Sequence, residues 1–150
     1  MSHVANVEVE INDLTALKTA CDKLGLEFKQ GQTTYEWFNS YLADSDVGRQ
    51  TVRDGFKPED FGKCEHAIKV PGSEYEVGVV KSPTGNGYRL IYDEYGSQGQ
   101  AITKRLGGTQ LTKLKTEYGV ARATSHLRRN GYRVARRVLA NGTVKITGVQ

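Results

Sequence analysis

The first 25 residues show two patterns of hydrophobic positions, one after the other. Residues 4–11 alternate apolar and polar side chains, which predicts a half-buried β-strand. Over residues 14–24 the apolar positions recur every three or four residues, as they do on one face of a helix. Asn12 or Asp13 offers an N-cap for this helix, and Gly25 is placed to end it. We therefore expect a strand followed directly by a helix.

The middle of the chain has the pattern of β-strands interrupted by one long irregular segment, residues 39–65, which we call the excursion. Residues 26–38 have a β-like composition that Gly31 breaks, so they predict two short strands or one bent strand. Periodicity then fades over residues 39–65, which hold either a short helix near 43–53 or a functional flap that acts as a lid or partner contact. Residues 66–95 contain strand-like runs separated by turn sequences, which predicts an antiparallel meander.

The last third predicts two helices and a hairpin. Residues 101–106 suggest a short helix, and Thr109 is a candidate N-cap for a longer helix that ends at Asn130. Asn141-Gly142 separates two alternating runs and predicts a β-hairpin over residues 132–149. The order of elements predicts an α+β fold: a mostly antiparallel sheet with two main helices packed on one face, as in a ferredoxin-like or related sandwich. We expect a single domain over residues 1–150, with the excursion at 39–65.

Charge is divided unevenly along the 150 residues. Residues 1–75 hold 8 Lys and Arg against 13 Asp and Glu, a net charge of −5, whereas residues 76–150 hold 13 against 4, a net charge of +9. From Gly96 onward eleven basic residues face one acid, Glu117. This asymmetry favours an anionic ligand, a nucleic acid, or the acidic half of a second copy, although a solvated basic face is the simpler alternative.

Two basic segments are candidate anion-binding sites. The first precedes the predicted long helix, where glycines allow close approach and free N–H groups attract anions; its residues are Lys104, Arg105, Gly107, Gly108 and Thr109. The second surrounds the hairpin, where guanidinium groups can bind phosphate bidentately; its residues are Arg128, Arg129, Arg133, Arg137 and Lys145. A plain capped turn and a basic edge that deters strand pairing remain as the alternatives.

Aromatic and soft side chains add weaker candidates. Tyr35 and Trp37 border the excursion and could stack on a base, although a place in the core is the simpler alternative. Cys64 and His66 lie two residues apart, so their side chains share a face if both belong to one strand. On one face they could act as a nucleophile and its base. His66 alone is also a candidate ligand-binding residue. No cysteine or histidine spacing predicts a metal site, and we expect no cofactor.

Several segments together resemble one family of proteins. They are the opening MSHV, EVEINDLTALKTACDKLG at 8–25, PGSEYEVGVVKSPTGNGYRLIYDEYG at 71–96, TEYGVARATSHLRRNGYRV at 116–134 and ANGTVKITG at 140–148. The chain thereby resembles the family named for a hypothetical chloroplast reading frame, which has plastid, cyanobacterial, bacterial and bacteriophage members. The excursion is more similar to that of the phage members. The resemblance implies an α+β fold and a cytoplasmic protein, and it implies no particular activity.

The partner class follows from the charge and the arginines. The first hypothesis is a non-catalytic protein that binds an anionic small molecule of the nucleotide type; a phage-encoded member would sequester a host signalling nucleotide. The alternatives are a nucleic-acid-binding protein, a homo-oligomeric adaptor, and an enzyme acting on a nucleotide with His66 or His126 as acid or base. No apolar run is long enough to span a membrane, so we expect no membrane partner.

Overall fold

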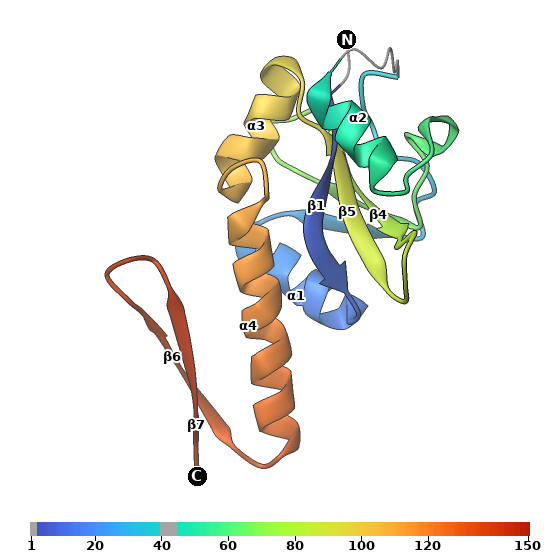
Figure 1. The fold of residues 1–150 in the computed structure, drawn as a ribbon. Coiled ribbons are helices and arrows are strands. Elements are labelled where there is room, and N and C mark those ends of the chain that lie inside the picture. The colour runs from blue at the N-terminus through green and yellow to red at the C-terminus, as the bar shows by residue number, and fades with distance from the viewer. Residues whose placement is uncertain (1–2, 40–44) are drawn as a thin grey trace.

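A computed structural model of the protein describes residues 3–39 and 45–150 (Figure 1). The strands are β1 (Val4–Ile11), β2 (Glu27–Gln30), β3 (His66–Lys69), β4 (Glu76–Lys81), β5 (Tyr88–Asp93), β6 (Arg133–Val138) and β7 (Val144–Val149). The helices are α1 (Leu14–Leu24), α2 (Asp46–Arg53), the short 3-10 helix η1 (Pro58–Asp60), α3 (Gly96–Leu106) and α4 (Thr112–Arg129).

Five strands form the main sheet in the order β1-β5-β4-β3-β2, and every pairing in it is antiparallel. The remaining strands, β6 and β7, form a separate two-stranded sheet. Helices α1 and α4 pack together against the main sheet, and the β6–β7 hairpin stands beside α4 (Figure 1). The predicted α+β fold, with a meander and two main helices on one face, is confirmed.

The first face of the sheet holds the larger core, beneath α1, α3 and α4. Alternate strand residues such as Val7, Leu90 and Tyr92 point to this face and pack against the helices. The Tyr118 hydroxyl on α4 accepts hydrogen bonds from the backbone N–H groups of Asn12 (2.9 Å) and Asp13 (3.2 Å). The long helix is thereby tied to the first turn of α1.

The second face is covered by α2 and by the chain on either side of it. The core there comprises Val4, Tyr35, Phe56, Phe61, Cys64, Ala67 and Ile91. The Thr51 hydroxyl on α2 donates to the backbone carbonyl of Val4 at 2.8 Å, which holds the helix against the edge strand β1. The excursion therefore contains the short helix expected there, although residues 40–44 lie outside the described residues.

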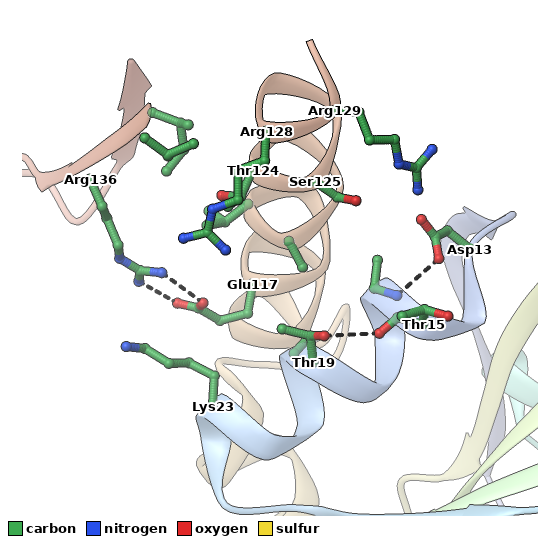
Figure 2. Close-up of a pocket in the computed structure, with 16 residues that line it drawn as sticks. Asp13, Thr15, Thr19, Lys23, Glu117, Thr124, Ser125, Arg128, Arg129 and Arg136 are labelled. Atoms are coloured by element: carbon green, nitrogen blue, oxygen red, sulfur yellow. Dashed lines mark hydrogen bonds and ion pairs between the residues drawn. The ribbon is translucent and has the colours of Figure 1, made fainter. Parts of the chain in front are cut away.

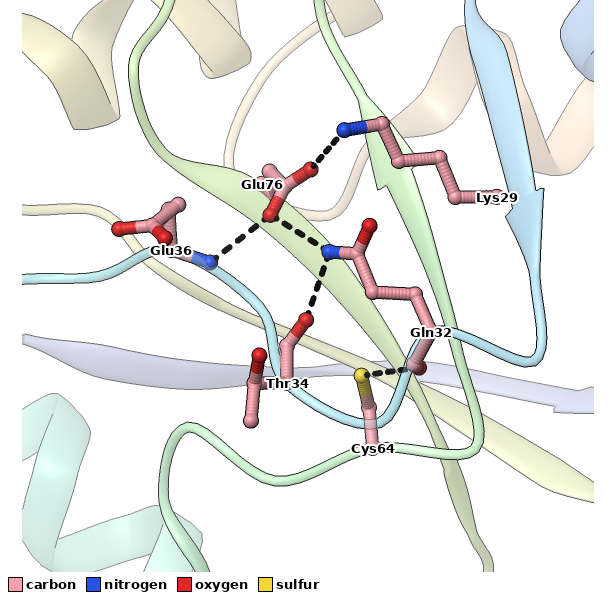
Figure 3. Close-up of polar contacts among 6 residues, drawn as sticks. All are labelled: Lys29, Gln32, Thr34, Glu36, Cys64 and Glu76. Carbon is pink, nitrogen blue, oxygen red and sulfur yellow. Dashed lines mark hydrogen bonds and ion pairs between the residues drawn. The ribbon is translucent and has the colours of Figure 1, made fainter.

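Two buried carboxylates fasten the segment after β2 to the sheet. Glu76 on β4 accepts hydrogen bonds from the Gln32 side chain (2.9 Å) and the Glu36 N–H (3.0 Å), and it forms an ion pair with Lys29 at 3.3 Å (Figure 3). Asp93, at the end of β5, accepts from the N–H of Phe38 at 3.1 Å. Charged acceptors inside a protein form strong bonds, so these two acids fix the path of the chain across the second face.

Several predicted boundaries are confirmed and others are wrong. Asp13 caps α1 through the Ala16 N–H, Gly25 ends that helix with a φ of 73°, and Asn130 ends α4. The second half of residues 26–38 forms one isolated bridge, between Thr34 and Lys63, in place of a second strand. Single backbone hydrogen bonds with Gly62, Cys64 and Glu76 hold this stretch, together with side-chain bonds, so its β-like composition does not produce a second strand.

Candidate functional site

Two of the backbone N–H groups expected to bind an anion before the long helix are already hydrogen-bonded. Gly107 is the C-cap of α3, and the N–H groups of Gly107 and Gly108 both bond the carbonyl of Thr103. The helix α4 begins after Leu111, which has a φ of 50°, so the expectation of Thr109 as its N-cap is wrong. The two glycines end α3, and their N–H groups are already hydrogen-bonded there.

The two cations of that segment belong to the last turn of α3. Arg105 donates to the backbone carbonyl of Leu24 at 2.9 Å, across the end of α1, while Lys104 is exposed. Both lie at the negative end of the α3 dipole, which stabilises cations. They therefore have a structural reason to be basic that involves no ligand.

The arginines of the hairpin divide between its two faces. Val134, Arg136 and Ile146 face α4, because they line the cleft beside that helix. Arg133, Arg137 and Lys145 alternate with them and lie on the outer face, with Arg137 directly opposite Lys145 in the register. The shared face expected for these three residues is confirmed, and it points away from α4.

A cleft of about 710 Å³ lies between α1, α4 and the inner face of the hairpin (Figure 2). Arg128 and Arg129 reach into it on opposite sides, Arg128 toward the hairpin and Arg129 toward Asp13 (Figure 2). Its apolar floor and its hydroxyl groups come from the facing surfaces of the two helices, namely Ala16, Ala20, Val120, Ala121, Thr15, Thr19, Thr124 and Ser125. The volume is in the range of small-molecule sites.

One bidentate ion pair holds the hairpin against α4. The Arg136 guanidinium donates to both carboxylate oxygens of Glu117, at 3.0 and 2.6 Å. The Glu117 side chain is 12% exposed, and that of Arg136 is 32% exposed. The hydrogen bonds from Arg136 hold the pKa of the Glu117 carboxyl below its ordinary value of 4.5. The single acid after Gly96 is therefore committed to one of the eleven basic residues of that region.

Glu117→Gln is expected to loosen the hairpin, since the neutral amide cannot form the bidentate ion pair. The loss should be about 1 kcal/mol, the upper value for an exposed pair, or roughly a fivefold faster hydrogen exchange of β6 and β7 amides. Hydrogen-exchange mass spectrometry would measure it. Arg136→Gln should have the same effect, and the double variant should add nothing. Additive effects in the double variant would contradict the pairing.

The same pair gives the hairpin a defined pH dependence. A carboxyl whose pKa is lower in the folded state adds stability that is complete above its unfolded pKa and is lost as the pH falls through the folded value. Protection of β6 and β7 should therefore fall below about pH 4.5, the ordinary pKa of a glutamate side chain. In Glu117→Gln this acid-dependent part should be absent.

The aromatic candidates lie away from the cleft. Tyr35 is buried on the second face, where a Cβ added at Gly78 would lie 2.5 Å from a carbon of its ring. Its ring therefore has no free face for a base, which corrects that expectation. Trp37 is half-buried and packs edge-on against Phe61, with 5.9 Å between ring centroids. Neither residue lines the cleft.

Cys64 and His66 do not form a pair. Cys64 lies in the second-face core and precedes β3, so strand alternation does not apply to it. Its thiol donates to the carbonyl of Gln32 at 3.2 Å (Figure 3), and burial raises its pKa from 9.0 to about 12. The His66 ring lies against Phe28 and Tyr88, which pack on the first-face core. A thiol that stays protonated at neutral pH is a poor nucleophile.

The sequence missed the cleft residues that come from α1. Lys23 and the threonines of α1 are more than 100 residues from the arginines of the cleft, and no local pattern links them. Arg136 could have been found, because it alternates with Arg133 and Arg137 and must face the opposite way. Among residues 3–39 and 45–150, no cluster of three or more His, Cys, Asp or Glu side chains is arranged to hold a metal ion.

Comparison of the chain with protein-family models, with curated proteins and with solved structures finds no match in any of the three. The resemblance to the chloroplast reading-frame family stays a prediction. In the part of the chain that the structure describes, no helix combines the length and the apolar character needed to cross a membrane.

Proposed function

We propose that the protein binds a phosphorylated small molecule, of the nucleotide type, in the cleft between α1, α4 and the hairpin. The observation that carries the proposal is the charge of the lining. Lys23, Arg128 and Arg129 all line the cleft, and among the described residues none of them forms an ion pair. The lining acids are Asp13 and Glu117, and Glu117 is already bound to Arg136. The cleft thus offers surplus positive charge in a concave site.

The remaining lining fits the same class of ligand. The hydroxyl groups of Thr15, Thr124 and Ser125 also line the cleft, and hydroxyls donate hydrogen bonds to phosphate oxygens. The Thr19 hydroxyl is already used, because it donates to the backbone carbonyl of Thr15 at 3.0 Å. Guanidinium groups add bidentate hydrogen bonds. No aromatic side chain lines the cleft, so it is the phosphate groups that this surface is suited to recognise.

The Arg128→Ala/Arg129→Ala double variant is expected to bind phosphorylated probes at least tenfold more weakly than the wild type. Hydrogen bonds to charged groups are worth about 1.5 to 3 kcal/mol each, which corresponds to more than a tenfold change in affinity. Calorimetric titration with pyrophosphate, ADP and a cyclic dinucleotide would measure it. Thr124→Val should weaken the same probes, and by a smaller factor.

Arg133→Ala/Arg137→Ala is the matched control for net charge. It removes two arginines from the outer face of the hairpin and should leave affinity for these probes unchanged within about twofold. Equal affinity of the wild type and the Arg128→Ala/Arg129→Ala variant would overturn the proposal, as would an equally large loss in the control variant. Absence of binding of all three probes to the wild type would also overturn it.

Two other hypotheses have their own tests. Neither His66 nor His126 lines the cleft, so the histidines considered as acid or base for an enzyme do not reach a ligand there. A homo-oligomeric adaptor, with the acidic half of one copy on the basic half of another, predicts a mass in light scattering that falls from low to high salt. A monomer at low salt would exclude it.

A further inference from the structure

The outer face of the β6–β7 hairpin is an exposed basic surface that does not line the cleft. The hairpin pairs with no strand of the main sheet, and it stands out from the body beside α4 (Figure 1). Its inner face is occupied, because Val134, Arg136 and Ile146 turn toward the helix. The outer face carries the exposed side chains of Arg133, Ala135, Arg137, Lys145, Thr147 and Val149.

The cations of this face repel one another and lack acidic partners. Arg137 lies directly opposite Lys145 in the register, where like charges destabilise a strand pair. Among the described residues, none of Arg133, Arg137 and Lys145 forms an ion pair. The one hydrogen bond of these three side chains runs from Arg133 to the carbonyl of Gln150, at 3.4 Å.

Neighbouring residues cannot supply the missing negative charge. Glu117 is the one acid in residues 96–150, and it is bound to Arg136 on the other face of the hairpin. None of the acids in residues 3–39 and 45–95 forms an ion pair with these cations either, so the outer face is free to bind an anion on another molecule.

The spacing of the cations favours a polyanion over a small anion. Arg133 and Arg137 are four residues apart on one strand, which places them about 13 Å from one another. When the two side chains extend away from the sheet they meet separate anionic groups, and the backbone of a nucleic acid carries charges at short, regular intervals. The shape is also suitable: two strands about 4.8 Å apart form a ribbon, and the B-DNA major groove, about 12 Å wide, admits a two-stranded ribbon.

We propose that the outer face of the β6–β7 hairpin binds double-stranded DNA, with the ribbon in the major groove and Arg133, Arg137 and Lys145 on phosphates or base edges. This inference does not depend on the proposed function of the cleft, because the two surfaces lie on opposite faces of the hairpin. Arg128 and Arg129 belong to the cleft and are left unchanged in the test.

The test compares binding of a fluorescent 20-base-pair duplex to the wild type and to the triple variant Arg133→Ala/Arg137→Ala/Lys145→Ala. We expect at least tenfold weaker binding in the triple variant by anisotropy. Its slope of log affinity against log salt should become shallower by about 2.7, if each side chain neutralises one phosphate. Thermal denaturation of both proteins checks that the variant is folded.

A second triple variant controls for net charge. Lys18, Lys57 and Lys69 are exposed and form no ion pair among the described residues, so their replacement by alanine removes the same charge from other surfaces. This variant should keep its affinity for the duplex within about twofold. Equal losses in the two triple variants would overturn the proposal, as would a salt-independent affinity.

Binding of other polyanions tests whether the hairpin enters the major groove of DNA. An RNA duplex of the same length should bind less tightly, because its deep, narrow major groove does not admit side chains. Binding of that RNA, of a single strand or of heparin as tightly as DNA would overturn the major-groove assignment. A salt-sensitive dimer that disappears in the hairpin triple variant would assign the surface to a second copy and would likewise overturn it.

Discussion

Asp93→Ala is expected to destabilise the fold by about 3 to 6 kcal/mol, because it removes the acceptor of three backbone N–H groups that would each lose about 1 to 2. The carboxylate is 0% exposed. One oxygen accepts from His3 (2.9 Å) and Tyr95 (3.0 Å), and the other accepts from Phe38 (3.1 Å). The bonds connect β1, the segment after β2 and the start of α3 to the end of β5. Urea denaturation would measure the loss.

Asp93→Asn separates the loss of acceptors from the loss of packing. The amide keeps one oxygen as an acceptor and places an NH₂ group where the other was, so the cost should be about half that of alanine. It also keeps the variant measurable if Asp93→Ala does not fold. A denaturation midpoint within experimental error of the wild type in both variants would contradict the role given to this carboxylate.

Gly99→Ala is expected to cost about 3 kcal/mol or more, at the upper end of the range for overpacking. An added Cβ would lie 2.1 Å from the carbonyl carbon of Glu94 and 2.3 Å from its oxygen. These are backbone atoms, so the first turn of α3 has to move. That helix carries Ile102 and Leu106, both at 0% exposure in the first-face core. Thermal denaturation would show the loss as a lower midpoint.

Gly119→Ala is the matched control on α4. An added Cβ there meets nothing within 4 Å, and the residue is exposed in a helix interior. Alanine should stabilise the fold by up to about 1 kcal/mol through helix propensity. The two substitutions are chemically identical and should have opposite signs. A Gly99→Ala variant with the same thermal denaturation midpoint as the wild type would show that the first turn of α3 accommodates the methyl group without strain.

The parts of the fold that were predictable from sequence are those set by neighbouring residues. The cap at Asp13, the stop at Gly25 and the Asn141-Gly142 hairpin each depend on a few adjacent positions. The start of α3 at Gly96 was missed because its first turn holds two glycines, which have low helix propensity. Thr109 was misassigned because Gly107 suits a helix end as well as a helix start.

The candidate site was predictable in charge and not in geometry. Arg128 and Arg129 are adjacent in the sequence, and the structure places both in one cleft. Their separation from Gly107 follows from the length of α4: 18 residues at 1.5 Å each place its two ends about 27 Å apart. Sequence alone gave no means to see that Lys23 would face the arginines, since α1 and α4 meet through tertiary packing.

The sheet order also determines when each strand can pair as the chain is made. Strands β3, β4 and β5 each lie beside the strand that precedes them, so β2 to β5 can pair in the order of synthesis. The first strand differs, because β1 pairs with β5, and Val4 lies opposite Asp93. Its apolar residues Val7 and Ile11 pair with Leu90 and Tyr88, which are made 83 and 77 residues later. While residues 12–87 are being synthesised, β1 therefore exposes apolar side chains and has no partner strand.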